Sequence, residues 1–356
     1  MPRAPRRPSA VLQTVTIRDV AAKAGVSVAT VSRVFNRKGP IREDTFERVT
    51  AIAAEMRYVP DAAARSLSTR STSTIGVVLP ELHGEFFSEV IRGIDIAARH
   101  SGYHLLVSGS HSNSEEMRAV LRAVRGRVDG LIVMSPDLEP SAMLADFPSS
   151  FPLVLLNSRV DGRPNITIDN SGGARAVVRH LAALGHKRIA FVRGPSQNAD
   201  AEQRLRGYRG AVRSAGIEAD RNLESAGNFT EESGYEAVKR ILAAGPRPTA
   251  IFTANDAMAI GALGALVEAG CAVPDEIALI GFDDIPIARF LAPPLTTVNV
   301  PIADLGRRGF ELLRDSTVTP PSAQTLKLET TLVVRQSCGA AQRPPQHESR
   351  RRTKSK

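Results

Sequence analysis

Few residues in this sequence are placed for covalent chemistry. The adjacent acids Asp283 and Asp284 could suggest a hydrolase, but neighbouring residues at one strand end point apart, and no second acid is placed opposite them. The sequence contains neither a G-x-S-x-G turn nor a phosphate-binding Walker loop. Its seven histidines and two cysteines lack the spacing of metal ligands. We therefore predict a protein that is not an enzyme and that holds no metal or cofactor.

Residues near the N-terminus have types and spacing that suit the recognition of a partner, not covalent chemistry. Thr16 and Asp19 fit the start of a short helix that ends at Gly25, and Ser27 fits the cap of a second helix over Val28 to Asn36. Two short helices joined by such a turn form a helix-turn-helix. This arrangement predicts that the second helix faces DNA.

The second helix carries the side chains expected to read bases. Val28, Ala29 and Ser32 are small enough for close approach to a groove, and Arg33 suits a bidentate contact with guanine. A third helix over Arg42 to Met56 completes a small apolar core. The residues expected to hold phosphates are Thr16, Ser27, Thr30, Ser32 and Asn36. The alternative is a plain three-helix packing unit with solvated arginines, but charge and turn chemistry both favour DNA.

Charge is concentrated at the two ends of the chain. The net charge is +9, to which residues 1–71 contribute +7, residues 340–356 contribute +5 and the stretch between them −3. A basic end domain suggests a polyanionic partner, most simply nucleic acid. Residues 340–356 have no aliphatic side chain beyond two alanines. We expect them, and the similar residues 1–13, to be disordered and solubilising.

Length and composition limit the class of protein. The 356 residues are enough for two or three domains with sizeable cores, and 42% of them are hydrophobic, which excludes a mostly disordered chain. No apolar run approaches the roughly 20 residues of a membrane span, and the N-terminus lacks an apolar signal core. Two cysteines imply no disulfide framework. We expect a cytoplasmic protein without a membrane partner.

Residues 72–339 alternate strand-like apolar runs with amphipathic helices. Strands are expected at 75–79, 104–107, 131–134, 153–156, 188–192, 250–253 and 277–282. Helices are expected at 86–100, 114–125, 171–184, 202–214, 231–242 and 256–269. This alternation predicts parallel sheets covered by helices, and its length predicts two lobes. Ligands of such folds bind at the carboxyl ends of the strands.

Several of these stretches resemble one family. The run TIRDVAAKAGVSVATVSRVFN at 16–36 resembles the DNA-reading headpiece of the LacI/GalR family of bacterial transcription repressors, and YVPDAAARSL at 58–67 resembles the family's hinge helix. Four further runs resemble the family's periplasmic-binding-protein-like core: LGHKRIAF at 184–191, TANDAMAIG at 253–261, GFDD at 281–284 and PPLTTV at 293–298. The resemblance extends to about residue 335.

The resemblance implies a small all-helical helix-turn-helix DNA-binding domain and hinge helix, followed by a two-lobed α/β core with parallel sheets. The headpiece would span 14–60, the hinge helix and linker 61–71, and the effector-binding and dimerisation core 72–339. The first lobe would hold about 72–166 and 301–330, and the second about 167–300 and 331–339. Paired hinge helices of the family enter the minor groove, which implies that Ala64 contacts DNA and that Leu67 wedges between bases.

The resemblance also implies an effector pocket. Arg204, Asp283 and Asn255 match polar residues that hold the effector, and a guanidinium fork suits hydroxyl or carboxylate groups. Two phenylalanines, Phe86 and Phe87, match positions on the side of the first lobe.

Three further residues complete the expected pocket. Phe229 matches an aromatic that closes on the ligand, while Glu81 and Asn157 fall at strand ends near the cleft. Alternatives stay open, because Arg204 could be a helix-surface arginine, Asn255 a helix cap, and both Phe86 and Phe87 core residues. We expect one of these two phenylalanines in the core and the other in the pocket. We expect Asp284 to serve in a turn or cap.

These observations predict a ligand-responsive, sequence-specific transcriptional regulator, foremost a repressor. It would bind a near-palindromic double-stranded DNA operator as a homodimer. Its effector would be a sugar, a nucleoside or a similar small polar metabolite. The alternatives are a ligand-independent DNA-binding regulator, which the pocket residues argue against, and a solute-binding protein, which the headpiece and the missing signal sequence argue against.

Overall fold

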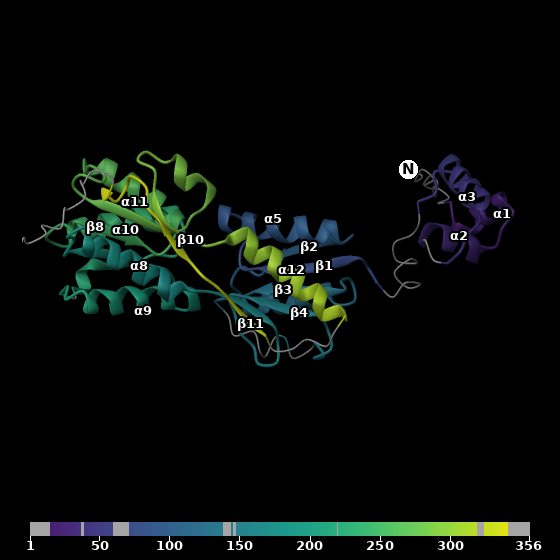
Figure 1. Cartoon of the computed structure of the whole chain (residues 1–356), viewed down its shortest axis with the longest axis horizontal. Helices are drawn as coiled ribbons and strands as arrows, with labels where there is room; N and C mark the ends of the chain where they lie inside the picture. The colour runs from purple at the N-terminus through teal and green to yellow at the C-terminus, as the bar shows by residue number, and fades with distance from the viewer. Residues whose placement is uncertain are drawn as a thin grey trace, which may run out of the picture. The chain divides into compact units, whose positions relative to one another are not determined.

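The structure is a computed structural model that describes residues 15–36, 39–59, 71–137, 144, 147–218, 220–318 and 324–340. The chain divides into two compact units, Met1–Thr72 and Ser73–Lys356 (Figure 1). The two basic ends expected to be disordered lie outside the described residues, apart from Ala340. The hinge residues 61–70, with Ala64 and Leu67, also lie outside them.

The described residues of the first unit form three helices. They are α1 (Ile17–Ala24), α2 (Val28–Asn36) and α3 (Glu43–Glu55). The Asp19 carboxylate accepts hydrogen bonds from the N–H and the hydroxyl of Thr16, which fixes the start of α1. Gly25 has a φ of +63°, so the chain can turn sharply into α2. All three expected helices are confirmed, and their buried side chains form one small core: Val20, Ala21, Ala24, Val31, Val34, Val49 and Ala53.

The second unit contains two sheets, of which the first has six strands in the order β11-β5-β4-β3-β1-β2. These strands are β1 (Thr74–Leu79), β2 (His104–Gly109), β3 (Gly130–Met134), β4 (Leu153–Leu156), β5 (Asn165–Ile168) and β11 (Thr325–Leu328). All neighbouring strands are parallel. Such a sheet is buried on both faces and needs helices on each.

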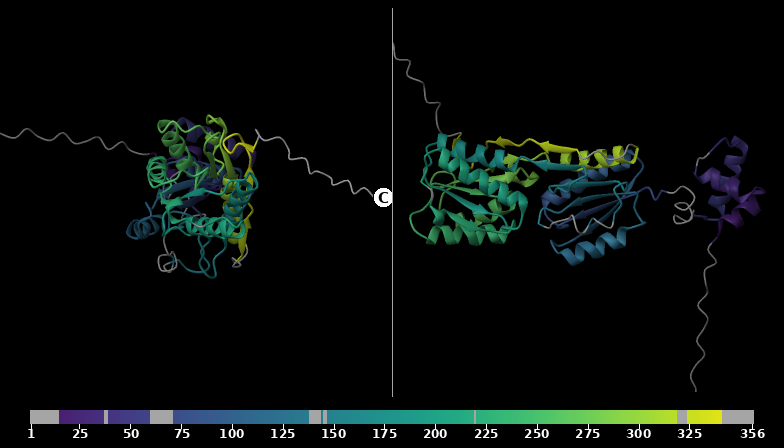
Figure 2. Two further views of the ribbon diagram at one scale, coloured as in Figure 1. Left: turned by 90° about the vertical axis from the view of Figure 1, so that its left-hand side faces the viewer. Right: turned by 90° about the horizontal axis from the view of Figure 1, so that it is seen from below.

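Among the helices that the structure describes, three cover the first sheet. Side chains of α5 (Glu85–His100) and α12 (Ile302–Val318) pack with Ile75, Val77 and Leu79 of β1. Val78 points the other way, into a cluster with α6 (Ser114–Val124). Figure 2 shows these helices on the sheet.

The second sheet has the order β12-β10-β9-β8-β6-β7. Its strands are β6 (Ile189–Arg193), β7 (Glu224–Ala226), β8 (Ala250–Thr253), β9 (Ala278–Asp283), β10 (Thr296–Asn299) and β12 (Thr331–Val333). All pairs are parallel except β10 with β12, which is antiparallel. Helices α8 (Asn170–Ala183) and α9 (Ala199–Ser214) lie on one face, and α10 (Glu231–Ala243) and α11 (Asp256–Glu268) on the other (Figure 1). Two short 3-10 helices, η1 (Arg221–Leu223) and η2 (Pro286–Phe290), complete this part of the chain.

The chain passes between the two sheets three times, after β5, after β10 and after β11. The first passage follows Ile168, so the expected change of lobe at residue 166 falls inside β5. The described elements that the sequence did not predict are β5, β7, β10, β11, β12, α12, η1 and η2. Over the described residues, we find no helix with the length and apolar character that crossing a membrane requires.

Candidate functional site

The exposed face of α2 carries the side chains predicted to read DNA bases. Val31 and Val34 are buried in the core of the first unit, whereas Val28, Ala29 and Arg33 are exposed, Val28 at 41%. Ser32 is partly exposed on the same helix. No described residue forms an ion pair with Arg33, so its guanidinium has no anionic partner within this part of the chain.

The polar residues predicted to hold phosphates lie at the start of α1, just before α2 and along α2. Ser27 Oγ accepts a hydrogen bond from Thr30 N–H at 3.1 Å and lies 2.9 Å from the Thr30 hydroxyl. Asn36 Nδ2 donates to Ser32 Oγ at 3.1 Å. Thr16 caps the first helix. That these hydroxyl and amide groups hold phosphates stays a prediction.

The second unit contains a cavity of about 410 Å³ lined by the loops that follow the strands of both sheets. The structure brings all eight predicted effector residues to this cavity: Glu81, Phe86, Phe87, Asn157, Arg204, Phe229, Asn255 and Asp283. Glu81 follows β1, Asn157 follows β4, and Asp283 ends β9, so carboxyl strand ends of both sheets face the same space. This is the position at which open α/β folds bind ligands. The cavity is within the volume range of small-molecule pockets.

Arg204 and Asp283 form an ion pair at the wall of the cavity. Arg204 Nη1 lies 3.2 Å from Asp283 Oδ1, and each residue is only 4% exposed. Arg204 also donates from Nε to Asn170 Oδ1 at 2.8 Å and from Nη1 to the carbonyl of Ala254. Its guanidinium lies 3.8 Å from the ring centroid of Phe282, a cation–π contact. The arginine is therefore a buried, firmly held group, not a residue of the helix surface.

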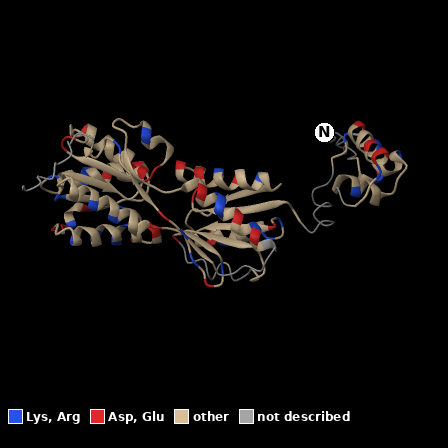
Figure 3. Ribbon diagram, viewed as in Figure 1, with Lys and Arg blue, Asp and Glu red and all other residues tan. Residues whose placement is uncertain are grey.

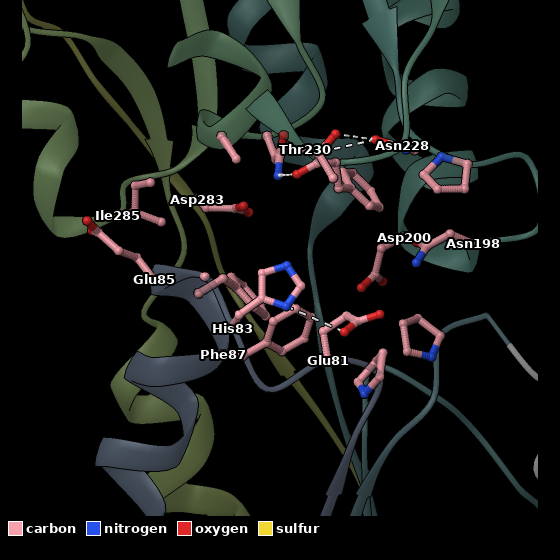
Figure 4. Close-up of a pocket in the computed structure, with 18 of the residues that line it drawn as sticks. Glu81, His83, Glu85, Phe87, Asn198, Asp200, Asn228, Thr230, Asp283 and Ile285 are labelled. Carbon is pink, nitrogen blue, oxygen red and sulfur yellow. Dashed lines mark hydrogen bonds and ion pairs between the residues drawn. The ribbon is translucent and has the colours of Figure 1, made fainter. Parts of the chain in front are cut away.

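A third charged residue, Asp200, lies beside this pair. Its carboxylate points into the cavity (Figure 4) and accepts a hydrogen bond from Asn170 Nδ2 at 2.8 Å. Burial raises the pKa of Asp200 to about 6 and the pKa of Asp283 to about 7, although the positive charge of Arg204 opposes both shifts. The site thus holds two buried acids and one buried base.

Asn255 has a structural role in addition to its place at the cavity. Its Oδ1 accepts a hydrogen bond from Met258 N–H and so caps α11, as the alternative interpretation expected. Its Nδ2 donates to the carbonyl of Phe229 at 3.0 Å. Asn255 can cap α11 and also line the cavity, because it lies in the turn between β8 and α11.

The aromatic residues come from both lobes. Phe86 and Phe87, in the first turn of α5, are both partly buried and both line the cavity, with ring centroids 5.5 Å apart. The expectation that one of them belongs to the core alone is wrong, because the start of α5 lies at the open carboxyl edge of the sheet. Phe229 lines the opposite side, in the loop before α10.

Four non-glycine residues that line the cavity have positive φ angles, which such residues rarely adopt. The φ angle is +49° at Ser112, +53° at Asn157, +71° at Phe229 and +114° at Asp283. Each such conformation costs of order 1–3 kcal/mol and tends to occur at functional sites. Together with the buried acids, these angles support a site shaped for a ligand.

Two neighbouring acids have structural positions. Asp284 forms an ion pair with Arg335 at 2.6 Å and accepts from Asn299 Nδ2, so it holds the turn after β9, close to the expected turn role. Asp256 is fully buried and accepts from Thr297 Oγ1 and from Ile285 N–H. Burial raises the pKa of Asp256 well above its usual range.

Sequence reasoning missed Asp200 and two hydrogen bonds that connect the lobes. Asn198 Nδ2 donates to Asp137 Oδ1 at 2.6 Å, and Ile287 N–H donates to Glu85 Oε2 at 3.0 Å. The predicted helix start at 202 is wrong: α9 begins at Ala199, because Asn198 caps it through Ala201 N–H. An Asn followed by acidic residues is a recognisable cap signal, and it would have placed Asp200 in the first turn, facing the cavity.

Comparison with known proteins gives matches over both units. The family model described as "Bacterial regulatory proteins, lacI family" matches residues 16–61, and the model described as "Periplasmic binding protein-like domain" matches residues 178–338. The chain is 36% identical over 324 residues to the ribose operon repressor of Escherichia coli K12, covering 90% of this chain and 98% of that protein. It is 37% identical over 303 residues to the transcriptional regulator GalR of the same strain, covering 83% and 88%.

Solved structures give the same result. The lac repressor dimer bound to operator and the anti-inducer ONPF has a TM-score of 0.84 and 31% identity, over 92% of this chain and 99% of that chain. A complex of the transcriptional regulator CelR with cellobiose has a TM-score of 0.68 and 34% identity, over 91% and 99%. The alignments cover nearly the full length of both matched chains.

Proposed function

Because this chain belongs to the LacI family of bacterial regulatory proteins, and so is a DNA-binding regulator of transcription, we propose that it is a ligand-switched repressor of a near-palindromic operator. The proposed effector is a small polar metabolite such as a sugar or a nucleoside. The proposed active species is a homodimer. The arrangement that supports this best is the cavity with eight expected effector residues on the same chain as a helix-turn-helix.

The DNA-reading part of the proposal rests on α2. Its exposed face offers Val28, Ala29 and Arg33 for base contacts in the major groove, with the hydroxyl residues at its border for phosphates. A two-fold dimer would place two such helices in successive major grooves, which requires an operator with two-fold symmetry. The matched lac repressor structure is a dimer bound to operator, which supports the same arrangement here.

The switching part rests on the two-lobed core. The lobes are joined by three short crossings, and polar contacts bridge them on both sides of the cavity, through Asn198 and Asp137 and through Ile287 and Glu85. A ligand held by residues of both lobes favours one relative position of the lobes over others. Since β1 begins directly after the linker, that position would set the spacing of the two hinge segments in a dimer. A few kcal/mol of differential affinity suffices for such a switch.

The proposal is tested first by thermal-shift screening of the full chain against free sugars, sugar phosphates, sugar acids and nucleosides. A binding ligand raises the melting temperature by mass action. We expect a specific shift that both Asp283→Ala and Arg204→Ala abolish, and a change in operator affinity when that ligand is present. If no compound shifts the melting temperature, the ligand-independent regulator becomes the better interpretation.

Dimerisation and operator symmetry need their own measurement. Selection of bound duplexes from a random DNA library should yield an inverted repeat, and sedimentation equilibrium should give twice the chain mass at the concentrations used for binding. A selected site without two-fold symmetry, or a monomer that binds it fully, would contradict the homodimer.

A further inference from the structure

The cavity carries far more negative than positive charge. From this negative charge and from the buried acceptors of the cavity, we infer that the cavity binds an uncharged ligand with several hydroxyl groups. Asp200 is then the residue that excludes anions. This inference rests on the proposed effector-sensing function and narrows it, because sugar phosphates, sugar acids and nucleotides would be rejected.

The charge imbalance is visible in the residues that line the cavity. Six of them are acids: Glu81, Glu85, Asp137, Asp200, Glu231 and Asp283. The only lysine or arginine among the described lining residues is Arg204, and His83 lies 3.5 Å from Glu81. Figure 4 shows acids on both sides of the space, Asp200 and Asp283 from the second lobe and Glu81 from the first. An anionic ligand would therefore meet like charges from both lobes.

The positive charge of Arg204 is already matched by acids of the protein itself. Arg204 forms an ion pair with Asp283 at 3.2 Å, and its positive charge opposes the rise in the pKa of Asp200 that burial causes. Two of its nitrogens donate to Asn170 and to the carbonyl of Ala254. The buried group of one base and two acids thus has a net charge of −1 when both acids are ionised.

The cavity offers buried acceptors that the protein itself satisfies poorly. Asn157 Oδ1 accepts no hydrogen bond from a described residue, and Asp283 Oδ1 has only the ion pair with Arg204 at 3.2 Å, although both residues are no more than 5% exposed. Buried acceptors without donors are costly, and hydroxyl groups of a ligand would supply the missing donors.

The amide nitrogens of the site are largely used within the protein. Asn198 donates to Asp137, and Asn255 donates to the carbonyl of Phe229. Phosphate and carboxylate groups need donors, so they would find few here. The aromatic rings of Phe86, Phe87 and Phe229 provide apolar surface for the C–H faces of a ring.

Asp200 is the acid best placed to decide charge selectivity. It lies 8% exposed in the first turn of α9, its carboxylate faces the cavity, and Asp137 of the other lobe adds like charge to it. The other interpretation is that Asp200 only positions Asn170 and, through it, Arg204. A positioning role predicts equal losses for charged and uncharged ligands, whereas charge exclusion predicts a changed ratio between them.

The test is isothermal titration of the full-length chain with matched compounds: free pentoses, hexoses, disaccharides and nucleosides, and their phosphates and uronic acids. We expect an uncharged compound to bind and its anionic counterpart to bind at least about 100-fold more weakly, since like charges a few ångströms apart in a buried site repel strongly. In Asp200→Asn the ratio of the dissociation constant of the anionic compound to that of its uncharged counterpart should fall at least about tenfold. The melting temperature should stay within a few degrees of wild type.

Two further variants keep the test decisive. Glu202→Gln removes the same charge from the same helix but outside the cavity, so the ratio should not change. If Asp200→Asn fails to fold, Asp137→Asn in the other lobe takes its place, and it should lower the same ratio of dissociation constants. An anionic compound that binds as tightly as its uncharged parent overturns the inference and leaves effector sensing intact. Binding by no compound of either kind overturns the proposed sensor function itself.

Discussion

At the residue scale, Arg204 neutralises the buried acids of the cavity. Removing the arginine would leave Asp283 and Asp200 buried without a counter-charge, and breaking such a pair costs roughly 3–5 kcal/mol. We expect Arg204→Ala to lower the free energy of unfolding of the core by that order. Urea unfolding followed by circular dichroism measures it. Arg206→Ala, exposed on the same helix, should change it by no more than about 0.5 kcal/mol. Similar losses for both variants would refute a special role for the buried arginine.

The same acids predict a pH dependence. Burial raises the pKa of Asp283 to about 7 and that of Asp200 to about 6, so the folded chain binds protons at these sites more tightly than the unfolded chain does. The free energy of unfolding should therefore rise, through these two groups, as the pH falls from 8 to 5. His180 acts in the opposite sense, because burial lowers its pKa.

The comparison with a variant separates these contributions. Asp283→Asn removes one titrating acid and retains His180, so its melting temperature should gain less than that of wild type between pH 8 and pH 5. Thermal melts at fixed ionic strength give both slopes. Parallel curves for the two proteins would show that Asp283 does not titrate in this range.

The sequence identified the types of these residues but not their pairing. Arg204 and Asp283 were predicted from the resemblance to the LacI/GalR family, which names the residues but does not show the ion pair between them. Asp200 was missed because α9 begins three residues before the predicted start. The left-handed angles at Asn157 and Asp283 have no local sequence signal, since neither is a glycine and each depends on the strands that hold it.

At the scale of elements, α5 and α12 approach each other closely through glycines. A Cβ atom at Gly93 of α5 would lie 2.0 Å from the carbonyl oxygen of Ala303, which is backbone and cannot move alone. Gly93→Ala should force the two helices apart and lower the free energy of unfolding by about 1–3 kcal/mol. The matched control is Gly210→Ala in α9, where a Cβ meets nothing within 4 Å and where alanine should stabilise the helix by up to about 1 kcal/mol. Chemical denaturation of both variants tests the contrast, and a neutral Gly93→Ala would contradict it.

Recognition of DNA by α2 is a second prediction at this scale. Arg33 is exposed on α2 and suited to a bidentate base contact, so Arg33→Ala should weaken binding to the selected operator by about 1–3 kcal/mol and relax its specificity. Arg48→Ala, exposed on α3, serves as the control and should not change the preference for operator over random DNA. Fluorescence anisotropy with both duplexes measures the ratio. An unchanged ratio for Arg33→Ala would assign base reading to other residues.

Elements were predictable where an apolar run is long or periodic. The central strands β1, β3, β8 and β9 are short stretches of buried aliphatic residues, and the sequence located them to within a residue or two. Strands β7 and β12 have three residues each and lie at sheet edges, so they carry no such signal. The antiparallel direction of β12 follows from the third crossing between lobes, which is a property of the whole chain.

At the scale of the whole molecule, the two ends of the second unit lie on opposite sides of the cavity. The linker enters at the amino end of β1 in the first sheet, whereas the last described residues run beside the amino end of β9 in the second, with Leu279 N–H donating to Ser337 O. The carboxyl ends of both sheets face the cavity between them. The elements of the second unit carry acidic and basic residues in close alternation (Figure 3). A surface of this kind gives little general attraction to DNA.

This geometry decides what the basic tail, residues 340–356, contributes. The tail leaves from the lobe that does not receive the linker, so we expect it to neutralise few phosphates when the headpiece holds its operator. Deleting it removes a charge of +5, and the slope of log K against log[salt] would become shallower by about 0.9 for every phosphate that the tail had neutralised. We therefore expect the slope for operator binding to stay within about one unit of wild type. A fall of several units, measured by salt titration of both proteins, would show that the tail reaches the DNA despite its attachment to the second lobe.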